Sequence, residues 1–181
     1  MGYYQQAEKT AEVLESNGWF HTGDIGELTA EGYLKITDRK KEIFKTSGGK
    51  YIAPQIMENS YKESRFIEQI MVIGEGEKFP AAFVQPDFDF LRDWAERKGF
   101  TLSTPEEIAR DHRVYERIME EIKASNEHFG KWEQVKEIAL TPDQWTVDGG
   151  QLTPKLSLKR RNIIKRYGDL YESVYGHLPW R

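Results

Sequence analysis

Two neighbouring stretches decide how this chain is interpreted: GWFHTGD at residues 18–24 and DRKKE at residues 38–42. The first ends in a glycine turn that presents the carboxylate of Asp24. A carboxylate can accept hydrogen bonds from both hydroxyls of a ribose, and an arginine such as Arg39 can complete the grip. Residue types alone leave a second interpretation open, a turn aspartate and a surface arginine on a charged linker.

The composition indicates a globular protein with a modest core and a charged surface. The chain has 181 residues, of which 38% are hydrophobic and 31% charged, enough for one domain or a small domain plus a piece of another. A net charge of −4 gives no reason to expect nucleic-acid binding. Without cysteine there is no disulfide or thiolate site, and the four histidines lack metal-ligand spacing, so no metal site is predicted. No apolar run approaches the roughly 20 residues of a membrane span.

Hydrophobic periodicity and turn residues predict an α+β fold. Strands are expected at residues 20–28, 32–37, 41–46, 66–73, 81–85 and 135–140, and the two at 66–73 and 81–85 are apolar enough to be buried. Helices are expected at residues 5–17, 54–64, from 86 onward, 104–109, 114–122 and 160–175. Ser103 or Thr104 is expected to cap the helix at 104–109.

The quoted stretches resemble the nucleotide-contacting and hinge motifs of the adenylate-forming enzymes, and within them most of all the long-chain acyl-CoA synthetases. The resemblance runs from Met1 to about Tyr175. It implies that the chain is a C-terminal fragment of a longer enzyme. Residues 1–39 would be the β-rich end of the large N-terminal AMP-binding domain. Residues 40–181 would be the small mobile lid domain, a short, mainly antiparallel sheet flanked by helices, with the hinge at about residues 38–42.

The resemblance also implies roles for the motif residues. Asp24 would bind the ribose hydroxyls of ATP and of the acyl-adenylate, and Arg39 would contact the nucleotide. Lys41 would be the pivot of the hinge. The loop of Ser47, Gly48 and Gly49 would line the tunnel for the pantetheine arm of CoA, although paired glycines in general indicate a hairpin turn.

The stretch QLTPKLSLKRR at residues 151–161 resembles the segment in which relatives place an active-site lysine. In this chain Ser157 occupies the matching position. Lys155 stands two residues before it and Lys159 two after. On an extended segment, residues two apart point the same way, so either lysine could take over the catalytic role.

The resemblance implies that the parent is a cytoplasmic fatty acid–CoA ligase. It leaves open that the parent associates with a membrane through peripheral contact. It would use ATP, Mg²⁺ and CoA, and the fragment would be inactive alone because its phosphate loop and acyl pocket lie in the missing N-terminal domain. Three alternatives stay open: a sister enzyme that loads a carrier protein, a non-catalytic degenerate lid, and a free-standing α+β domain with no nucleotide link.

Overall fold

Strands β5 (Ile67–Ile73), β6 (Ala81–Pro86) and β7 (Glu137–Leu140) form the central sheet, with β6 in the middle. β5 pairs with β6 in antiparallel fashion, and β6 pairs with β7 in parallel. Successive side chains of a strand point to opposite faces, and both faces are covered here. Ile70 and Val72 enter one core cluster, whereas Met71 and Ile73 enter the other. Burial on both faces explains the continuous apolar runs that predicted these strands.

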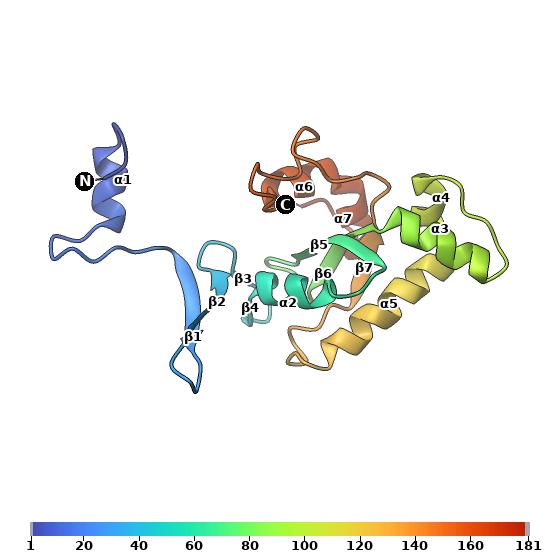
Figure 1. The fold of residues 1–181 in the computed structure, drawn as a ribbon, viewed down its shortest axis with the longest axis horizontal. Helices are drawn as coiled ribbons and strands as arrows, with labels where there is room; N and C mark the ends of the chain where they lie inside the picture. The colour runs from blue at the N-terminus through green and yellow to red at the C-terminus, as the bar shows by residue number, and fades with distance from the viewer. Residues whose placement is uncertain (1, 180–181) are drawn as a thin grey trace.

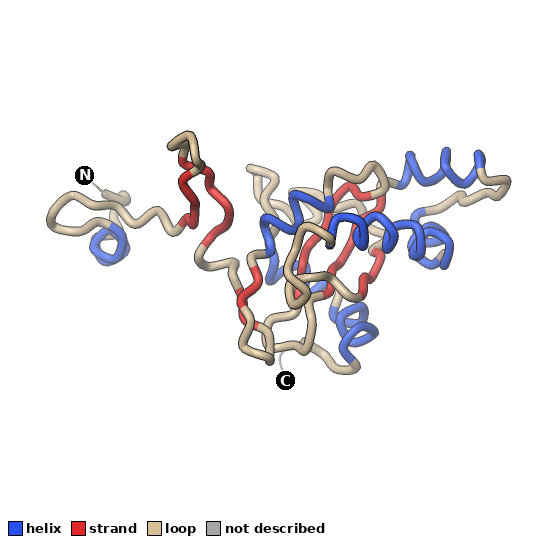
Figure 2. The backbone as a smooth tube through the Cα atoms, turned by 90° about the horizontal axis from the view of Figure 1, so that it is seen from below, coloured by secondary structure: helices blue, strands red, loops and turns tan. Residues whose placement is uncertain are grey.

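Helices cover the two faces of this sheet in the computed structural model, which describes residues 2–179 (Figures 1 and 2). On one side lie α2 (Pro54–Tyr61), α3 (Phe88–Arg97), α4 (Pro105–Arg110) and α5 (His112–Asn126). On the other lie α6 (Arg160–Arg166) and α7 (Gly168–Tyr175). Thr104 is the cap of α4, because its side chain accepts from the Glu107 N–H while the Glu107 carboxylate accepts from the Thr104 N–H.

Residues 2–39 stand apart from this packed body, as Figure 1 shows, except where Asp38 near the end of the segment contacts α2. They contain α1 (Ala7–Val13) and an antiparallel ribbon of β1 (Asp24–Leu28) and β2 (Leu34–Arg39). A small hairpin of β3 (Phe44–Lys45) and β4 (Tyr51–Ile52) follows. Three of the four strand pairings in the described residues are antiparallel, which confirms the predicted α+β class with mainly antiparallel sheets.

Several element boundaries differ from the expected ones. The strand expected at 20–28 begins at Asp24, the one expected at 41–46 is reduced to β3, and β4 was not expected. The helix expected at 160–175 is two helices, because Tyr167 leaves the helical conformation at φ −106° and ψ 37°. Its ring packs against Phe83 and Trp145 there. No helix within residues 2–179 is both long enough and apolar enough to cross a membrane.

Candidate nucleotide site and hinge

The two residues proposed to hold a nucleotide lie side by side. Asp24 begins β1, Arg39 ends β2, and the two face each other in the strand register. The Nε of Arg39 lies 3.0 Å from Oδ1 of Asp24. Gly23 makes this arrangement possible with a φ of +76°, which favours glycine, and its carbonyl accepts from the Lys40 N–H at 2.9 Å. The ribbon therefore presents one carboxylate and one guanidinium together at its end.

The chemistry of this pair suits a ribose. A carboxylate accepts from vicinal hydroxyls, and a guanidinium has further N–H donors beyond the one that faces Asp24. The Asp24 side chain is 25% exposed and that of Arg39 is 59% exposed, so both can be reached from solvent. The structure thus brings together the two nucleotide-contacting residues that the sequence predicts.

Asp38 lies next to this pair but has a different environment. Only 1% of the residue is exposed, and its carboxylate accepts from the Gln55 N–H at 3.1 Å and from the Arg39 N–H. Burial raises the pKa of Asp38, against the effect of those two hydrogen bonds. Gln55 is in the first turn of α2, so Asp38 satisfies a backbone N–H that the helix cannot. It is a contact between the ribbon and the packed body.

Lys41 lies in an exposed turn between these two parts. The Arg39 carbonyl accepts from the Glu42 N–H at 2.8 Å and from the Ile43 N–H at 3.2 Å. The turn is thus closed by residues on either side of Lys41 and not by Lys41 itself. An exposed turn residue of this kind can change its backbone angles without losing packing, which is what a pivot needs.

The loop of Ser47, Gly48 and Gly49 is the turn of the β3–β4 hairpin. Thr46 N–H donates to the Lys50 carbonyl at 2.9 Å, and Gly49 has a φ of +78°. The hairpin is braced by the loop after β5: Ser47 N–H donates to the Glu77 carbonyl at 2.9 Å. A Cβ added at Gly48 would meet nothing closer than the Thr46 hydroxyl oxygen at 4.0 Å, so the loop has room for it there. The hairpin turn is confirmed, and the role toward CoA stays a prediction.

The segment before α6 is a tight hairpin. Leu152 and Leu158 form an antiparallel bridge, and Thr153 N–H donates to the Ser157 carbonyl at 2.8 Å. Leu156 has a φ of +60° at the turn. The assumption of one extended segment is therefore wrong for Lys155, which lies at the exposed tip of the hairpin. Ser157 and Lys159 share the returning arm, where residues two apart point the same way.

The lysines and the nucleotide pair belong to different parts of the molecule. Lys159 caps α6 on the packed body, whereas Asp24 and Arg39 lie on the ribbon that stands apart (Figure 1). Within residues 2–179, no group of three or more acidic or histidine side chains gathers to hold a metal ion.

The sequence interpretation missed an ion cluster of Glu42, Glu58 and Arg160, in which Glu58 is buried and the other two are partly exposed. Nη2 of Arg160 donates to Glu58, and its Nε lies 3.3 Å from Oε2 of Glu42. A signal for it was present, because Pro54, Met57, Glu58 and Tyr61 have helical spacing and all four are buried in α2. A carboxylate on the core side of a helix requires a counter-ion.

Comparisons with known proteins show the family to which the chain belongs. Residues 41–178 match the family described as "AMP-binding enzyme C-terminal domain". The chain belongs to this family. It is also homologous to the C-terminal part of long-chain fatty acid–CoA ligases. It is 42% identical over 180 residues to human "Long-chain-fatty-acid--CoA ligase 1". The aligned region covers 96% of this chain and 26% of that protein.

A plant relative and two solved structures extend the comparison. The chain is 34% identical to Arabidopsis thaliana "Long chain acyl-CoA synthetase 7, peroxisomal", with 98% of this chain and 26% of that protein covered. The adenylation domain of a carboxylate reductase from Mycobacterium chelonae matches with a TM-score of 0.79 at 25% identity, over 97% of this chain and 26% of that one. The same score, identity and coverage hold for the A domain of the Segniliparus rugosus carboxylic acid reductase, solved with AMP and a co-purified carboxylic acid. The chain spans about a quarter of the length of its curated relatives.

Proposed function

We propose that the chain is the C-terminal part of an ATP-dependent fatty acid–CoA ligase, which forms an acyl-adenylate and then an acyl-CoA thioester. The Asp24–Arg39 pair carries the proposal, because it offers a carboxylate and a guanidinium, 3.0 Å apart, at the end of the ribbon that leads into the lid domain. The identity of 42% to a human long-chain-fatty-acid–CoA ligase over 96% of the chain supports it.

In the first half-reaction a carboxylate oxygen of the fatty acid attacks the α-phosphorus of ATP. The P–O bond to pyrophosphate breaks, and pyrophosphate leaves with the electron pair. Asp24 would hold the two ribose hydroxyls, and Arg39 would contact the nucleotide beside it. The ammonium of Lys159 would offset the negative charge that develops on the phosphate oxygens.

In the second half-reaction the sulfur of CoA attacks the acyl carbon and forms the C–S bond of the thioester. The bond from the acyl carbon to the phosphate oxygen breaks, AMP leaves with that electron pair, and the thiol proton is released. Rotation of residues 40–179 about Lys41 would withdraw Lys159 and bring the hairpin of Ser47, Gly48 and Gly49 to the path of the pantetheine arm. Small residues suit such a path, because bare backbone lets a thin chain pass close by.

The remaining parts of the site would lie outside this chain. Mg²⁺ would be bound mainly by the rest of the parent, where it would neutralise phosphate charge. The phosphate-binding loop and fatty-acid pocket would also lie there. The exposed aromatic and aliphatic side chains of residues 2–37 support this arrangement, because they would be covered by the large domain.

The experiment compares the full-length parent with the 181-residue chain in pyrophosphate exchange and thioester formation. We expect both activities in the parent and neither in the chain alone. A folded parent that makes no acyl-adenylate from ATP and a long-chain fatty acid would refute the proposal. Turnover by the 181 residues alone would refute the assignment of the missing parts.

A second candidate function differs in the acceptor. The chain matches the A-PCP didomain of the Segniliparus rugosus carboxylic acid reductase with a TM-score of 0.76. The parent would then transfer the acyl group to the pantetheine of a carrier protein. Supplying CoA or a pantetheinylated carrier protein to pre-formed acyl-adenylate separates the two candidates. A parent that binds ATP but makes no adenylate would favour the third option, a degenerate lid marked by Ser157.

The proposed location follows from the proposed reaction. The parent would act in the cytoplasm, where ATP and CoA are supplied, and reach its acyl substrates through peripheral contact with a membrane. Fractionation of the parent into soluble and membrane-bound pools, with a salt wash, tests the peripheral contact.

A further inference from the structure

Arg160 begins α6 directly after Lys159, and its side chain contacts parts of the chain far away in the sequence. Its Nη1 donates to the Val72 carbonyl at 2.9 Å, and its Nη2 donates to Oε1 of Glu58. Its Nε lies 3.3 Å from Oε2 of Glu42. Only 18% of the side chain is exposed. One guanidinium therefore joins the start of α6 to the central sheet, to α2 and to the hinge segment.

Glu58 fixes the orientation of this guanidinium. Its side chain is 6% exposed, and Oε1 also accepts from the Val72 N–H at 2.8 Å. Burial raises the pKa of Glu58 to about 7, although Arg160 and the Val72 N–H act in the opposite direction. A buried carboxylate is stable only with a well-placed partner, and the planar fork of arginine offers donors in fixed directions. Arg160 therefore has little freedom to turn away.

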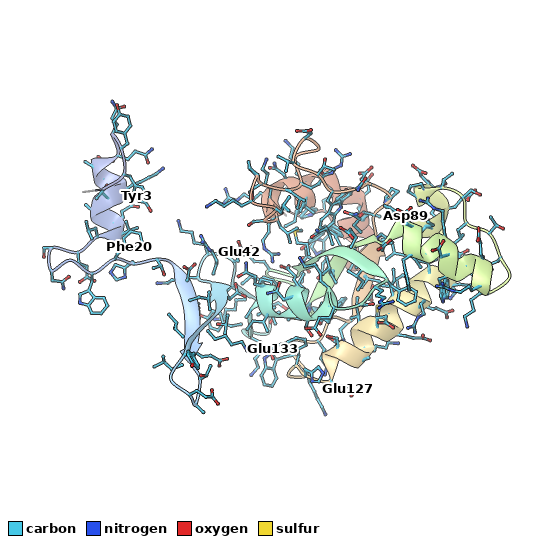
Figure 3. All side chains as sticks on the ribbon, viewed as in Figure 1. Tyr3, Phe20, Glu42, Asp89, Glu127 and Glu133 are labelled. Atoms are coloured by element: carbon cyan, nitrogen blue, oxygen red, sulfur yellow. The ribbon has the colours of Figure 1, made fainter. Side chains whose placement is uncertain are left out.

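Glu42 links the same guanidinium to the hinge. Figure 3 labels it where the N-terminal segment joins the packed body. It follows Lys41 directly, and its N–H closes the turn on the Arg39 carbonyl at 2.8 Å. A change of backbone angles at Lys41 therefore moves Arg39 and Glu42 relative to each other, and Glu42 is the side that contacts Arg160.

We propose that Arg160 is a positioning residue that couples the turn at residues 39–42 to the loop that carries Lys159. This inference rests on the proposed function. Arg160 is held by Glu58 and Val72, so its contact with Glu42 relates the position of the hinge turn to the start of α6. Lys159 directly precedes Arg160. Its N–H donates to the Gln151 carbonyl at 2.8 Å, which holds Lys159 to the hairpin before α6. The placement of Lys159 for adenylation then depends on the contact that Arg160 makes with Glu42 at the hinge turn.

Two variants of the full-length parent test the coupling without leaving Glu58 unpaired. Glu42→Gln removes only the charge at the hinge, and Arg160→Lys keeps a charge beside Glu58 but cannot span three acceptors. Each should lower kcat for adenylation about threefold to tenfold, the scale of a partly exposed ion pair, with KM for ATP within about twofold. Arg161→Ala, an exposed arginine at the next position, is the matched control and should leave both unchanged.

Thermal unfolding separates positioning from stability. Glu42→Gln should unfold within about 1–2 °C of the parent, because its ion pair is partly exposed. A rate loss in Glu42→Gln without a shift in Tm supports coupling. Rates equal to that of the control in both variants would overturn the coupling. A rate in Arg160→Lys equal to that of the parent would also overturn it, because a positive charge beside Glu58 would then be enough.

Hydrogen exchange of the 181-residue chain supplies a test that needs no catalysis. Exchange of the Lys159 amide should be faster by about threefold to tenfold in Glu42→Gln and Arg160→Lys, and unchanged in Arg161→Ala. Unchanged exchange in all three variants overturns the coupling whatever the parent does. A parent that makes no acyl-adenylate while the exchange still responds refutes the proposed function and leaves the coupling in place.

Discussion

The N-terminal segment, residues 2–39, and the packed body, residues 40–179, use similar side chains in opposite ways. In β6 every residue is buried. Between residues 2 and 37 no residue is buried, although aromatic and aliphatic side chains are frequent there. Those exposed by more than a third are Tyr3, Tyr4, Trp19, Phe20, Ile25, Leu28, Tyr33, Leu34 and Ile36. An apolar pattern can therefore specify an element that the packing of the described residues leaves exposed.

Truncation of a large apolar side chain should give the largest difference between the two regions in the free energy of unfolding. Phe83 in β6 is fully buried and packs against Tyr167, so Phe83→Ala should lower the free energy of unfolding by about 3–5 kcal/mol. Leu34→Ala in the ribbon, where the residue is 67% exposed, should change it by less than about 0.5 kcal/mol. Urea unfolding of the 181-residue chain measures both. Equal losses would mean that the ribbon has a core of its own.

The two regions should also respond differently to pH. Burial raises the pKa of Glu58 to about 7, whereas hydrogen bonds from Asn17 and Thr29 lower the pKa values of the exposed Glu15 and Glu31. A raised acid pKa favours the folded state at low pH. The contribution of Glu58 is therefore fully present below about pH 4.5 and is lost as the pH rises through about 7.

Glu58→Gln tests this direction. The stability of the wild-type chain minus that of the variant should be largest near pH 4.5 and fall toward pH 8. Urea unfolding at a series of pH values gives the difference directly. Glu15→Gln is the matched control in the N-terminal segment. A difference that grows with pH would mean that Glu58 is held as a carboxylate by Arg160 more strongly than burial opposes it.

Sequence patterns predicted the packed body better than its connections. The strands at 66–73 and 81–85 were found because both faces are buried, which leaves long apolar runs. The break between α6 and α7 at Tyr167 was not predicted, because it depends on the packing of the Tyr167 ring against Phe83, which no local sequence pattern shows. The parallel partner of β6 lies more than fifty residues away in the sequence. Such distant pairing depends on the whole fold.

The candidate site shows the same division. The chemistry of the two residues and the family resemblance predicted that Asp24 and Arg39 act together, and a single hairpin is enough to bring them together. The contacts of Arg160 with Glu42 and Glu58 join residues more than one hundred positions apart. Helical spacing indicates that Glu58 is buried, but it does not indicate which residue pairs with it. The hairpin at Leu156 was missed because a non-glycine residue adopts its positive φ of 60°.

The two lysines of the loop before α6, Lys155 and Lys159, should contribute differently to the rate of adenylation in the parent. Lys159→Ala should slow adenylation by about 10²-fold, the scale for removing one donor to a developing charge, whereas Lys155→Ala at the hairpin tip should have a smaller effect. The thioester step from pre-formed acyl-adenylate should be nearly unchanged in both. Rapid-quench measurement of each half-reaction tests this. Normal adenylation in both single variants and in the double variant would make the loop structural.

The nucleotide pair on the ribbon should affect binding more than chemistry. Asp24→Ala in the parent should weaken ATP binding by about 2–3 kcal/mol, because it removes a charged partner and leaves Arg39 without its neighbour. ATP titration by calorimetry measures the loss. Glu27→Ala, which removes an exposed carboxylate that faces Lys35 on the same ribbon, is the matched control and should leave the affinity for ATP unchanged. Equal affinity of Asp24→Ala and the parent would refute the assignment.

The hinge that we propose between the two regions gives the most selective test. Lys41→Pro fixes φ near −65° and should impair one half-reaction about tenfold more than the other, because the two need different orientations of the lid. The turn found here is closed by the N–H groups of Glu42 and Ile43, so proline at position 41 removes neither bond. Lys41→Ala removes the same side chain and leaves the backbone free, so it should affect both half-reactions equally and weakly. Pyrophosphate exchange and thioester formation, measured separately for the two variants, show whether Lys41 is the pivot. An equal loss in both half-reactions for Lys41→Pro would move the pivot elsewhere in residues 38–42, where Asp38 and Glu42 are each held by the packed body.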